Sequence, residues 1–237
     1  MDAIISMTTW KRRIALAGPV IFSFLSLEPI CDFKVVLVLS NNEFPGKEKD
    51  IPIDLVRLQV HPRFEILWTD KNTKAYKKYF PVRRKYPNVP IITVDDDEPA
   101  KENFLSALWK MHKTDETRVI YGYNGTPCGR GGIDCVRYGV GLYPPNSLFP
   151  LDEKFGMDFF KDMDDEYMRF LHIMKGTKYF EINAHSILHI QAVAQDSAMQ
   201  TIMASQWKEI SKMWDTVWAV FPEFHRIWDK NSIKSNR

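Results

Sequence analysis

An apolar, β-branched run that ends in a block of acids is the feature that most constrains the fold. Residues 89–94 (VPIITV) predict a buried strand, and Asp95, Asp96, Asp97 and Glu98 follow it directly. In an extended segment residues two apart point the same way, so Asp95 and Asp97 can address one ion while Asp96 points elsewhere. Crowded carboxylates repel one another unless a positive charge lies between them. Their hard oxygen atoms suit Mg²⁺ or Mn²⁺, and these ions in turn suit a phosphate-bearing ligand. The alternative is a solvated acidic turn, and the strand in front of the acids favours the metal site over it.

The first hundred residues alternate strand-like and helix-like segments. Strands are predicted at 3–8, 34–39, 64–68 and 89–94, and helices at 19–27, around Leu55 and at 73–85. This order favours an α/β fold with a doubly wound, mostly parallel sheet and flanking helices. Ligands of such sheets bind beyond the carboxyl ends of the strands, where the acids lie.

The second half has a different organisation. A helix at 99–113 and a strand at 119–123 are followed by a glycine-rich loop at 122–141. We expect a helix at 164–175 and short strands at 179–182 and 186–190. From Ser197 apolar residues recur at three- and four-residue spacing, which predicts an amphipathic, aromatic C-terminal helix that packs on the flank of the domain.

The composition is that of an ordinary globular protein. The 237 residues, without an internal repeat, predict a single domain, and a formal net charge of +2 gives no reason to expect a nucleic-acid partner. Cys31, Cys128 and Cys135 match no zinc motif and indicate a reducing compartment. Oligomeric state is not readable from the sequence.

A basic triplet at 11–13 and the apolar run at 14–27 superficially match a secretory signal. A predicted strand precedes the triplet, however, and Gly18-Pro19 interrupts the apolar run, which is shorter than the roughly 20 residues that span a bilayer. We therefore predict a cytoplasmic protein. Its C-terminal helix has a mixed polar face, so peripheral contact with the inner face of the membrane is the less favoured interpretation of that helix.

Two further charged segments accompany the acid block. Lys74 and Lys78 lie four apart on the basic segment 73–85, next to Asp70 at a strand end, and could hold a diphosphate. The alternative is a solvated helix face. Asp164 and Asp165 begin a predicted helix, where acids either cap the helix or provide a general base for an acceptor hydroxyl.

Five blocks of sequence, in order, resemble a group of bacterial glycosyltransferases of the GT-A type. They are 5–10 (ISMTTW) with Arg13-Ile14, 76–78 (YKK) with Tyr86-Pro87, 91–97 (IITVDDD), 139–145 (GVGLYPP) and 164–167 (DDEY). The chain departs from the group's pattern in two places. Lys11-Arg12 replaces a proline, and Glu98-Pro99 follows the aspartates where the group more often has an apolar residue and then an aromatic.

The resemblance implies a GT-A-like, Rossmann-related fold, a nucleotide-diphosphate-sugar donor and a divalent metal bound through the Asp-x-Asp motif. Residues 1–98 would form the nucleotide-binding half, 99–196 the sugar and acceptor half, and 197–237 a helical tail. It also implies individual roles. The nucleotide pocket would contain Thr8, Arg13, Asp70 and Lys78. Asp95 would lie near the ribose or the metal, and Asp97 would be the firmest metal ligand. Gly141, within 139–143, would shape the sugar and acceptor side, and Asp165, or Asp164 in its place, would be the base of an inverting reaction.

His185 and His189 are further candidates. GT-A enzymes often use a late histidine as a metal ligand, but the apolar neighbours of both favour histidines buried in the core.

The sequence thus predicts a metal-dependent glycosyltransferase that builds a bacterial surface polysaccharide or lipopolysaccharide on a glycan or lipid-linked acceptor. The alternatives are a metal-dependent phosphoryl-transfer or phosphatase-like enzyme and a non-catalytic nucleotide-sugar-binding protein. Asp-x-Asp phosphatases carry their motif near the first strand, whereas here it follows the fourth, which counts against the first alternative.

Overall fold

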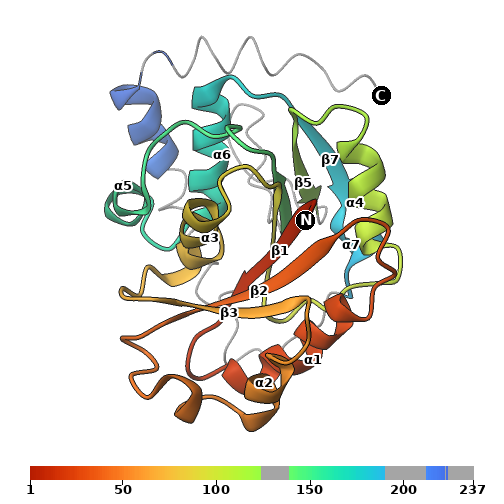
Figure 1. Cartoon of the computed structure of the whole chain (residues 1–237). Helices are drawn as coiled ribbons and strands as arrows, with labels where there is room; N and C mark the ends of the chain where they lie inside the picture. The colour runs from red at the N-terminus through yellow and green to blue at the C-terminus, as the bar shows by residue number, and fades with distance from the viewer. Residues whose placement is uncertain (124–138, 190–211, 222, 224–237) are drawn as a thin grey trace.

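The computed structural model describes residues 1–123, 139–189, 212–221 and 223. Its centre is a seven-stranded sheet with the strand order β3-β2-β1-β4-β6-β5-β7 (Figure 1). The strands are β1 (Ala3–Thr8), β2 (Phe33–Ser40), β3 (Phe64–Thr69), β4 (Ile91–Val94), β5 (Val119–Tyr123), β6 (Val140–Tyr143) and β7 (Tyr179–Asn183). β6 pairs antiparallel with both β4 and β5, and the other pairs are parallel.

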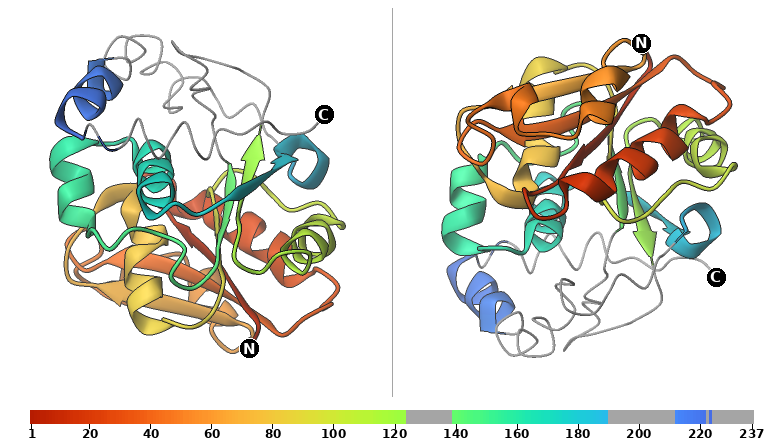
Figure 2. Two further views of the ribbon diagram at one scale, coloured as in Figure 1. Left: turned by 90° about the horizontal axis from the view of Figure 1, so that it is seen from above. Right: turned by 90° about the horizontal axis from the view of Figure 1, so that it is seen from below.

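Helices cover both faces of the sheet, as Figure 2 shows from two opposite sides. They are α1 (Ile14–Leu25), α2 (Ile53–Leu58), α3 (Phe80–Lys85), α4 (Phe104–His112), α5 (Glu153–Phe159), α6 (Asp164–Lys175) and α7 (Ala184–Ile187), with 3-10 turns η1 (Lys47–Lys49) and η2 (Lys74–Lys78). A hydrophobic core lies on each face of the sheet. One contains Ile5 of β1 and is covered by α1, α2 and α4; the other contains Ile4 of β1 and is covered by α3 and α6. The alternation along β1 divides the two cores because neighbouring strand residues face opposite sides. The predicted α/β class with a mostly parallel, doubly wound sheet and flanking helices is confirmed.

The first helix is longer than the sequence predicts. We expected it to start at Pro19, but α1 begins at Ile14 and contains Pro19 in its interior. Ile14, Ala17 and Ile21 are buried, whereas Pro19 is exposed. The backbone hydrogen bond that proline removes is therefore lost on the solvent side, where water can satisfy the unpaired carbonyl.

The basic segment 73–85 is not one helix. It divides at Tyr79 into η2 and α3, and Pro81 lies in the first turn of α3. Proline lacks the N–H that would bond to the carbonyl of Lys77, so it ends one helix and suits the start of the next. This break turns Lys77 and Lys78 into the interior, and both are buried. The interpretation of the segment as a solvated face is wrong for these two residues.

Two further elements differ from expectation. Residues 186–189 do not form the predicted strand, because Asn183 caps α7 by accepting a hydrogen bond from the His185 amide at 3.0 Å; residue 190 lies outside the described residues. The segment 140–143, expected within a glycine-rich loop, forms β6. Most of that loop lies outside the described residues, as do Cys128 and Cys135.

The C-terminal segment is described only at 212–221 and 223, and 212–220 is helical. Met213, Trp214 and Val217 are buried in the core beside α6, which agrees with the predicted apolar face. Trp214 also donates a hydrogen bond to Glu166 at 3.1 Å. The part of this predicted helix that precedes residue 212 lies outside the described residues. In the described part of the chain, no helix combines the length and the apolar character needed to cross a membrane.

His172 gives the fold a pH dependence that can be measured. Its ring packs edge-on against Tyr121 and Tyr179, and its Nδ1 has no hydrogen-bond partner among the described residues. Burial, reinforced by the charge of Arg169, lowers the pKa of His172 to about 3. The unfolded chain takes up this proton near the ordinary histidine pKa of about 6.5, so stability is complete above that pH and is lost as the pH falls toward 3.

We expect His172→Phe to remove this part of the acid sensitivity. At about 1.4 kcal/mol per pKa unit, the full contribution of His172 amounts to at most about 5 kcal/mol, of which about 3 kcal/mol falls between pH 7 and pH 4. The free energy of unfolding from urea titrations at pH 7 and pH 4 measures it. The wild-type protein should lose more stability between these values than the variant. Equal losses would show that His172 does not titrate in this way.

Candidate active site

The predicted site residues gather at one edge of the sheet. β1 and β4 are adjacent and parallel, so the segments that follow Thr8 and Val94 leave the sheet on the same side. The start of α6 lies against this edge through ion pairs of Lys78. Three segments that are far apart in the sequence therefore meet at the carboxyl ends of the parallel strands, where ligands of such sheets bind.

Arg13 joins the segment after β1 to the aspartates after β4. Its Nη2 lies 2.8 Å from Asp96 Oδ1 and 2.8 Å from Asp97 Oδ2. Thr9 Oγ1 donates a hydrogen bond of 2.5 Å to the other oxygen of Asp96. Burial raises the pKa of Asp96 to about 6, although Thr9 and Arg13 oppose the rise. Asp96 is thus a buried anchor of the loop, whereas Asp97 remains partly accessible.

Lys78 forms a second cluster with three carboxylates. Its Nζ lies 3.0 Å from Asp95 Oδ1, 3.0 Å from Asp164 Oδ2 and 3.8 Å from Asp165 Oδ1. Only 8% of the Lys78 side chain is exposed. Burial by itself would lower the pKa of Lys78. The negative charges of Asp164, Asp95 and Asp165 have the larger effect and raise this pKa well above the usual value. Lys78 therefore ties the exit of β4 to the start of α6, and its ammonium is directed at carboxylates of the protein.

The two aspartates at the start of α6 have different surroundings. The side chain of Asp164 is 13% exposed and that of Asp165 is 32% exposed. Burial, followed by the charge of Asp164, raises the pKa of Asp165 well above the usual range. Neither caps the helix, because the N-cap is Met163 and no side chain bonds there. The arrangement leaves Asp165 as the more accessible carboxylate and the better proton acceptor.

Three other predicted residues lie elsewhere or serve the fold. Asp70 accepts a hydrogen bond from Asn41 Nδ2 at 3.1 Å, and Lys74 pairs with Asp162 on the surface. Thr8 donates its hydroxyl hydrogen bond to the carbonyl of Val38 at 2.7 Å. Within the described residues no ion pair or hydrogen bond joins these three to the Arg13 and Lys78 clusters.

Gly141 lies in β6 beneath the ring of Tyr143. A Cβ at this position would come within 2.5 Å of the Tyr143 hydroxyl, so only glycine fits without a shift of that ring. Its carbonyl accepts a hydrogen bond from Thr93 Oγ1 at 3.4 Å. Burial, and next the charge of Asp165, raise the pKa of Tyr143. Gly141 thus allows a buried tyrosine to pack beside the site, and the role in shaping the sugar side stays a prediction.

The segment after the aspartates, which the resemblance did not explain, folds back over β6. A Cβ on Gly139 would lie 1.9 Å from Glu98 Oε2, which shows how closely this carboxylate covers the glycine. The carbonyl of Pro99 accepts a hydrogen bond of 2.8 Å from the amide of His189. Glu98-Pro99 therefore links the acid block to the start of β6 and to the segment after α7.

His185 and His189 are both exposed, so the interpretation of them as core histidines is wrong. Among the described residues no group of three or more His, Cys, Asp or Glu side chains is placed to hold a metal ion. The two histidines are thus not assembled with Asp95 and Asp97, and their role as ligands stays a prediction.

The carboxylates of Asp95 and Asp97 nevertheless fit a divalent cation. Lys78 and Arg13 make their shortest contacts with Asp95 Oδ1 and Asp97 Oδ2, so Asp95 Oδ2 and Asp97 Oδ1 are the oxygens that a cation would use. Mg²⁺ in phosphate-binding sites commonly uses one or two carboxylates and completes its coordination with water and substrate oxygens. Carboxylates also outnumber cations here, since five surround Arg13 and Lys78.

Sequence comparison found no protein-family model that matches the chain and no curated protein that is significantly similar. Among solved structures, the chain is similar to S. aureus TarS 1–349, with a TM-score of 0.39 and 16% identity over 64% of this chain and 40% of that one. The similarity to the same protein in complex with UDP has a TM-score of 0.48 and 12% identity over 80% of this chain and 60% of that one. The chain therefore spans about half the length of the structures it matches. Similarity at this level assigns no activity.

Proposed function

We propose that this protein is a glycosyltransferase that transfers a sugar from a nucleotide-diphosphate donor to a hydroxyl group of a glycan or lipid-linked acceptor. The observation that carries the proposal is the meeting of two clusters at one sheet edge. Arg13 holds Asp96 and Asp97, and Lys78 holds Asp95 beside Asp165. Two carboxylate oxygens suited to a cation thus lie next to a separate, partly open carboxylate suited to a base.

Each cluster would serve one half of the reaction. The bond between the anomeric carbon and the diphosphate breaks, and the diphosphate leaves with the electron pair. Asp95 and Asp97 would hold Mn²⁺ or Mg²⁺, which stabilises this charge when it is bound. Asp165 would accept the proton of the acceptor hydroxyl as its oxygen forms the new bond to the anomeric carbon. The product is the glycosylated acceptor with a free nucleoside diphosphate.

The remaining residues would keep these groups in place. Arg13 contacts one oxygen of Asp97 at 2.8 Å, which would orient the carboxylate so that its other oxygen could bind the cation. Lys78 keeps Asp95 and Asp165 at a constant separation because it contacts both. Such fixed geometry lowers the cost of bringing the donor and the acceptor together. Synthesis of a bacterial surface polysaccharide or lipopolysaccharide would give this activity its physiological acceptor.

Turnover of a panel of nucleotide-diphosphate sugars, with manganese or with a chelator, tests the proposal. We expect at least one sugar donor to release nucleoside diphosphate in manganese, with loss of that release in the chelator. Phosphomonoesters form the comparison panel. Release of inorganic phosphate from them would favour a phosphatase, and metal-dependent donor binding without turnover on any acceptor would favour a binding protein.

A further inference from the structure

The helix α1 is apolar on its outer side as well as its inner side. None of its 12 residues is charged. Ile14, Ala17 and Phe24 face the core, while Leu16 and Phe22 are exposed, Phe22 by 63%. A helix that is apolar all round is ordinarily covered on both sides. In the described part of the chain, nothing covers the outer side of α1.

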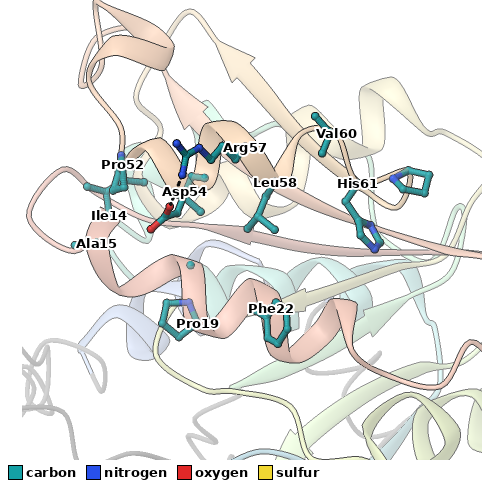
Figure 3. A pocket seen from close by; sticks show the side chains of 13 residues that line it. Ile14, Ala15, Pro19, Phe22, Pro52, Asp54, Arg57, Leu58, Val60 and His61 are labelled. Atoms are coloured by element: carbon teal, nitrogen blue, oxygen red, sulfur yellow. Dashed lines mark ion pairs between the residues drawn. The ribbon is translucent and has the colours of Figure 1, made fainter.

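α2 extends this exposed apolar surface. The two helices run side by side, and a groove of about 700 Å³ lies between them (Figure 3). Pro19 and Phe22 line it from α1, and Leu58 and Val60 line it from α2 and the turn that follows. Val60 is 90% exposed, and Ile53 at the start of α2 is exposed as well. We call this the α1–α2 surface; its exposed apolar side chains are Phe22 and Val60, which line the groove, and Ile53 at the start of α2.

Cations and an aromatic ring border the α1–α2 surface at the start of α1. Trp10, Lys11 and Arg12 are exposed, and the Arg12 guanidinium lies 5.5 Å from the centroid of the Trp10 ring. Neither Lys11 nor Arg12 forms an ion pair with the residues that the structure describes. The other charges on this surface, Asp54 and Arg57, lie 4.0 Å apart and offset each other, and His61 lines the far end of the groove.

We propose that the α1–α2 surface docks on an anionic lipid bilayer. Exposed Phe, Ile and Val side chains beside a tryptophan and uncompensated Lys or Arg residues are the composition of segments that lie in the membrane interface. A symmetric contact between two copies would place Lys11 and Arg12 of both copies in one interface, where they repel, whereas anionic headgroups attract them. The charge pattern thus favours lipid over a second copy.

Docking would also place the bilayer next to the site. Arg13, which holds Asp96 and Asp97, directly follows Lys11-Arg12 and precedes α1. Lipid headgroups at the start of α1 would therefore lie beside the carboxyl edge of β1 and β4. This last step rests on the proposed function, since it gives a lipid-linked acceptor direct access to the transferase site. The docking itself does not depend on catalysis.

Co-sedimentation of the full chain with vesicles tests the proposal. We expect binding to vesicles of phosphatidylcholine mixed with phosphatidylglycerol, and much weaker binding to phosphatidylcholine alone. The double variant Phe22→Ser/Val60→Ser should weaken partitioning by about tenfold or more, because it removes apolar area that the bilayer would bury. Lys11→Gln and Arg12→Gln should each weaken it about fivefold.

Matched variants elsewhere on the surface serve as controls. Val220→Ser replaces an exposed valine of the C-terminal helix, and Lys175→Gln and Lys178→Gln replace exposed lysines at the end of α6 and shortly after it. All should bind vesicles as the wild-type protein does, with unchanged unfolding temperatures throughout. Loss of binding in Val220→Ser but not in Phe22→Ser/Val60→Ser would overturn the proposal in favour of the C-terminal helix.

Two further results would also overturn it. One is the absence of binding to anionic vesicles, or equal binding to both vesicle types. The other is a concentration-dependent dimer, seen by analytical ultracentrifugation, that Phe22→Ser/Val60→Ser dissociates while vesicle binding persists. Vesicle binding needs no donor or acceptor, so it can succeed when the turnover assay fails, and the two proposals are judged separately.

Discussion

Replacement of Asp165 by asparagine is expected to lower kcat for sugar transfer by roughly 10²- to 10⁴-fold, the usual contribution of a general base. Asparagine keeps the shape of the side chain but cannot accept the proton of the acceptor hydroxyl. The KM for the donor should change little, because Asp165 lies at the start of α6 and not in the Asp95–Asp97 block. Steady-state kinetics over a range of donor concentrations, at saturating acceptor, measure both constants.

Asp164→Asn is the matched control, because it makes the same change at the neighbouring position. Asp164 is buried and lies 3.0 Å from Lys78, so its loss leaves the lysine with fewer compensating charges. We expect a loss of about 1–3 kcal/mol in the free energy of unfolding, as for other bonds to a charged group, with a smaller loss of kcat than in Asp165→Asn. Full turnover in Asp165→Asn together with inactive but folded Asp164→Asn would exchange their roles.

Sequence periodicity predicted the sheet well because strands leave a local signal. The limits of β1 and β5, and those of α6, were predicted to the residue, since each segment is a continuous or periodic apolar run bounded by polar residues. The errors lie where tertiary contacts override local preference. The helix α1 tolerates Pro19 because the lost hydrogen bond faces solvent, and β6 is held by its pairing with β4, which no local pattern reveals.

The site was predicted only in part, because some of its contacts also depend on tertiary structure and not on a local pattern. Motif order pointed to Arg13, Asp95, Asp97, Lys78 and the acids of α6, which the structure brings to one edge. It did not predict that Lys78 would be buried among carboxylates, because that depends on the break before Pro81. Thr9 and the anchoring role of Asp96 were also missed. The pair of threonines at the end of β1 was the available signal for Thr9, since alternate residues of an extended segment face opposite ways.

The proposed metal site depends most on Asp97. Its Oδ1, together with Asp95 Oδ2, is the cation site that the proposed mechanism requires. Asp97→Ala is expected to abolish manganese-dependent binding of the donor, because one carboxylate alone leaves the cation with a single protein ligand. The fold should survive, since Arg13 retains its ion pair with Asp96. Asp158→Ala, which removes an exposed aspartate paired with Lys154 on α5, is the matched control.

Calorimetric titration of a nucleoside diphosphate into the wild-type protein and the two variants, with manganese and with a chelator, tests the central claim most directly. We expect manganese to strengthen binding to the wild-type protein and to Asp158→Ala, and to have no effect on Asp97→Ala. Equal binding to the wild-type protein with and without manganese, or wild-type affinity in Asp97→Ala, would contradict the claim that this sheet edge is a metal-dependent diphosphate site.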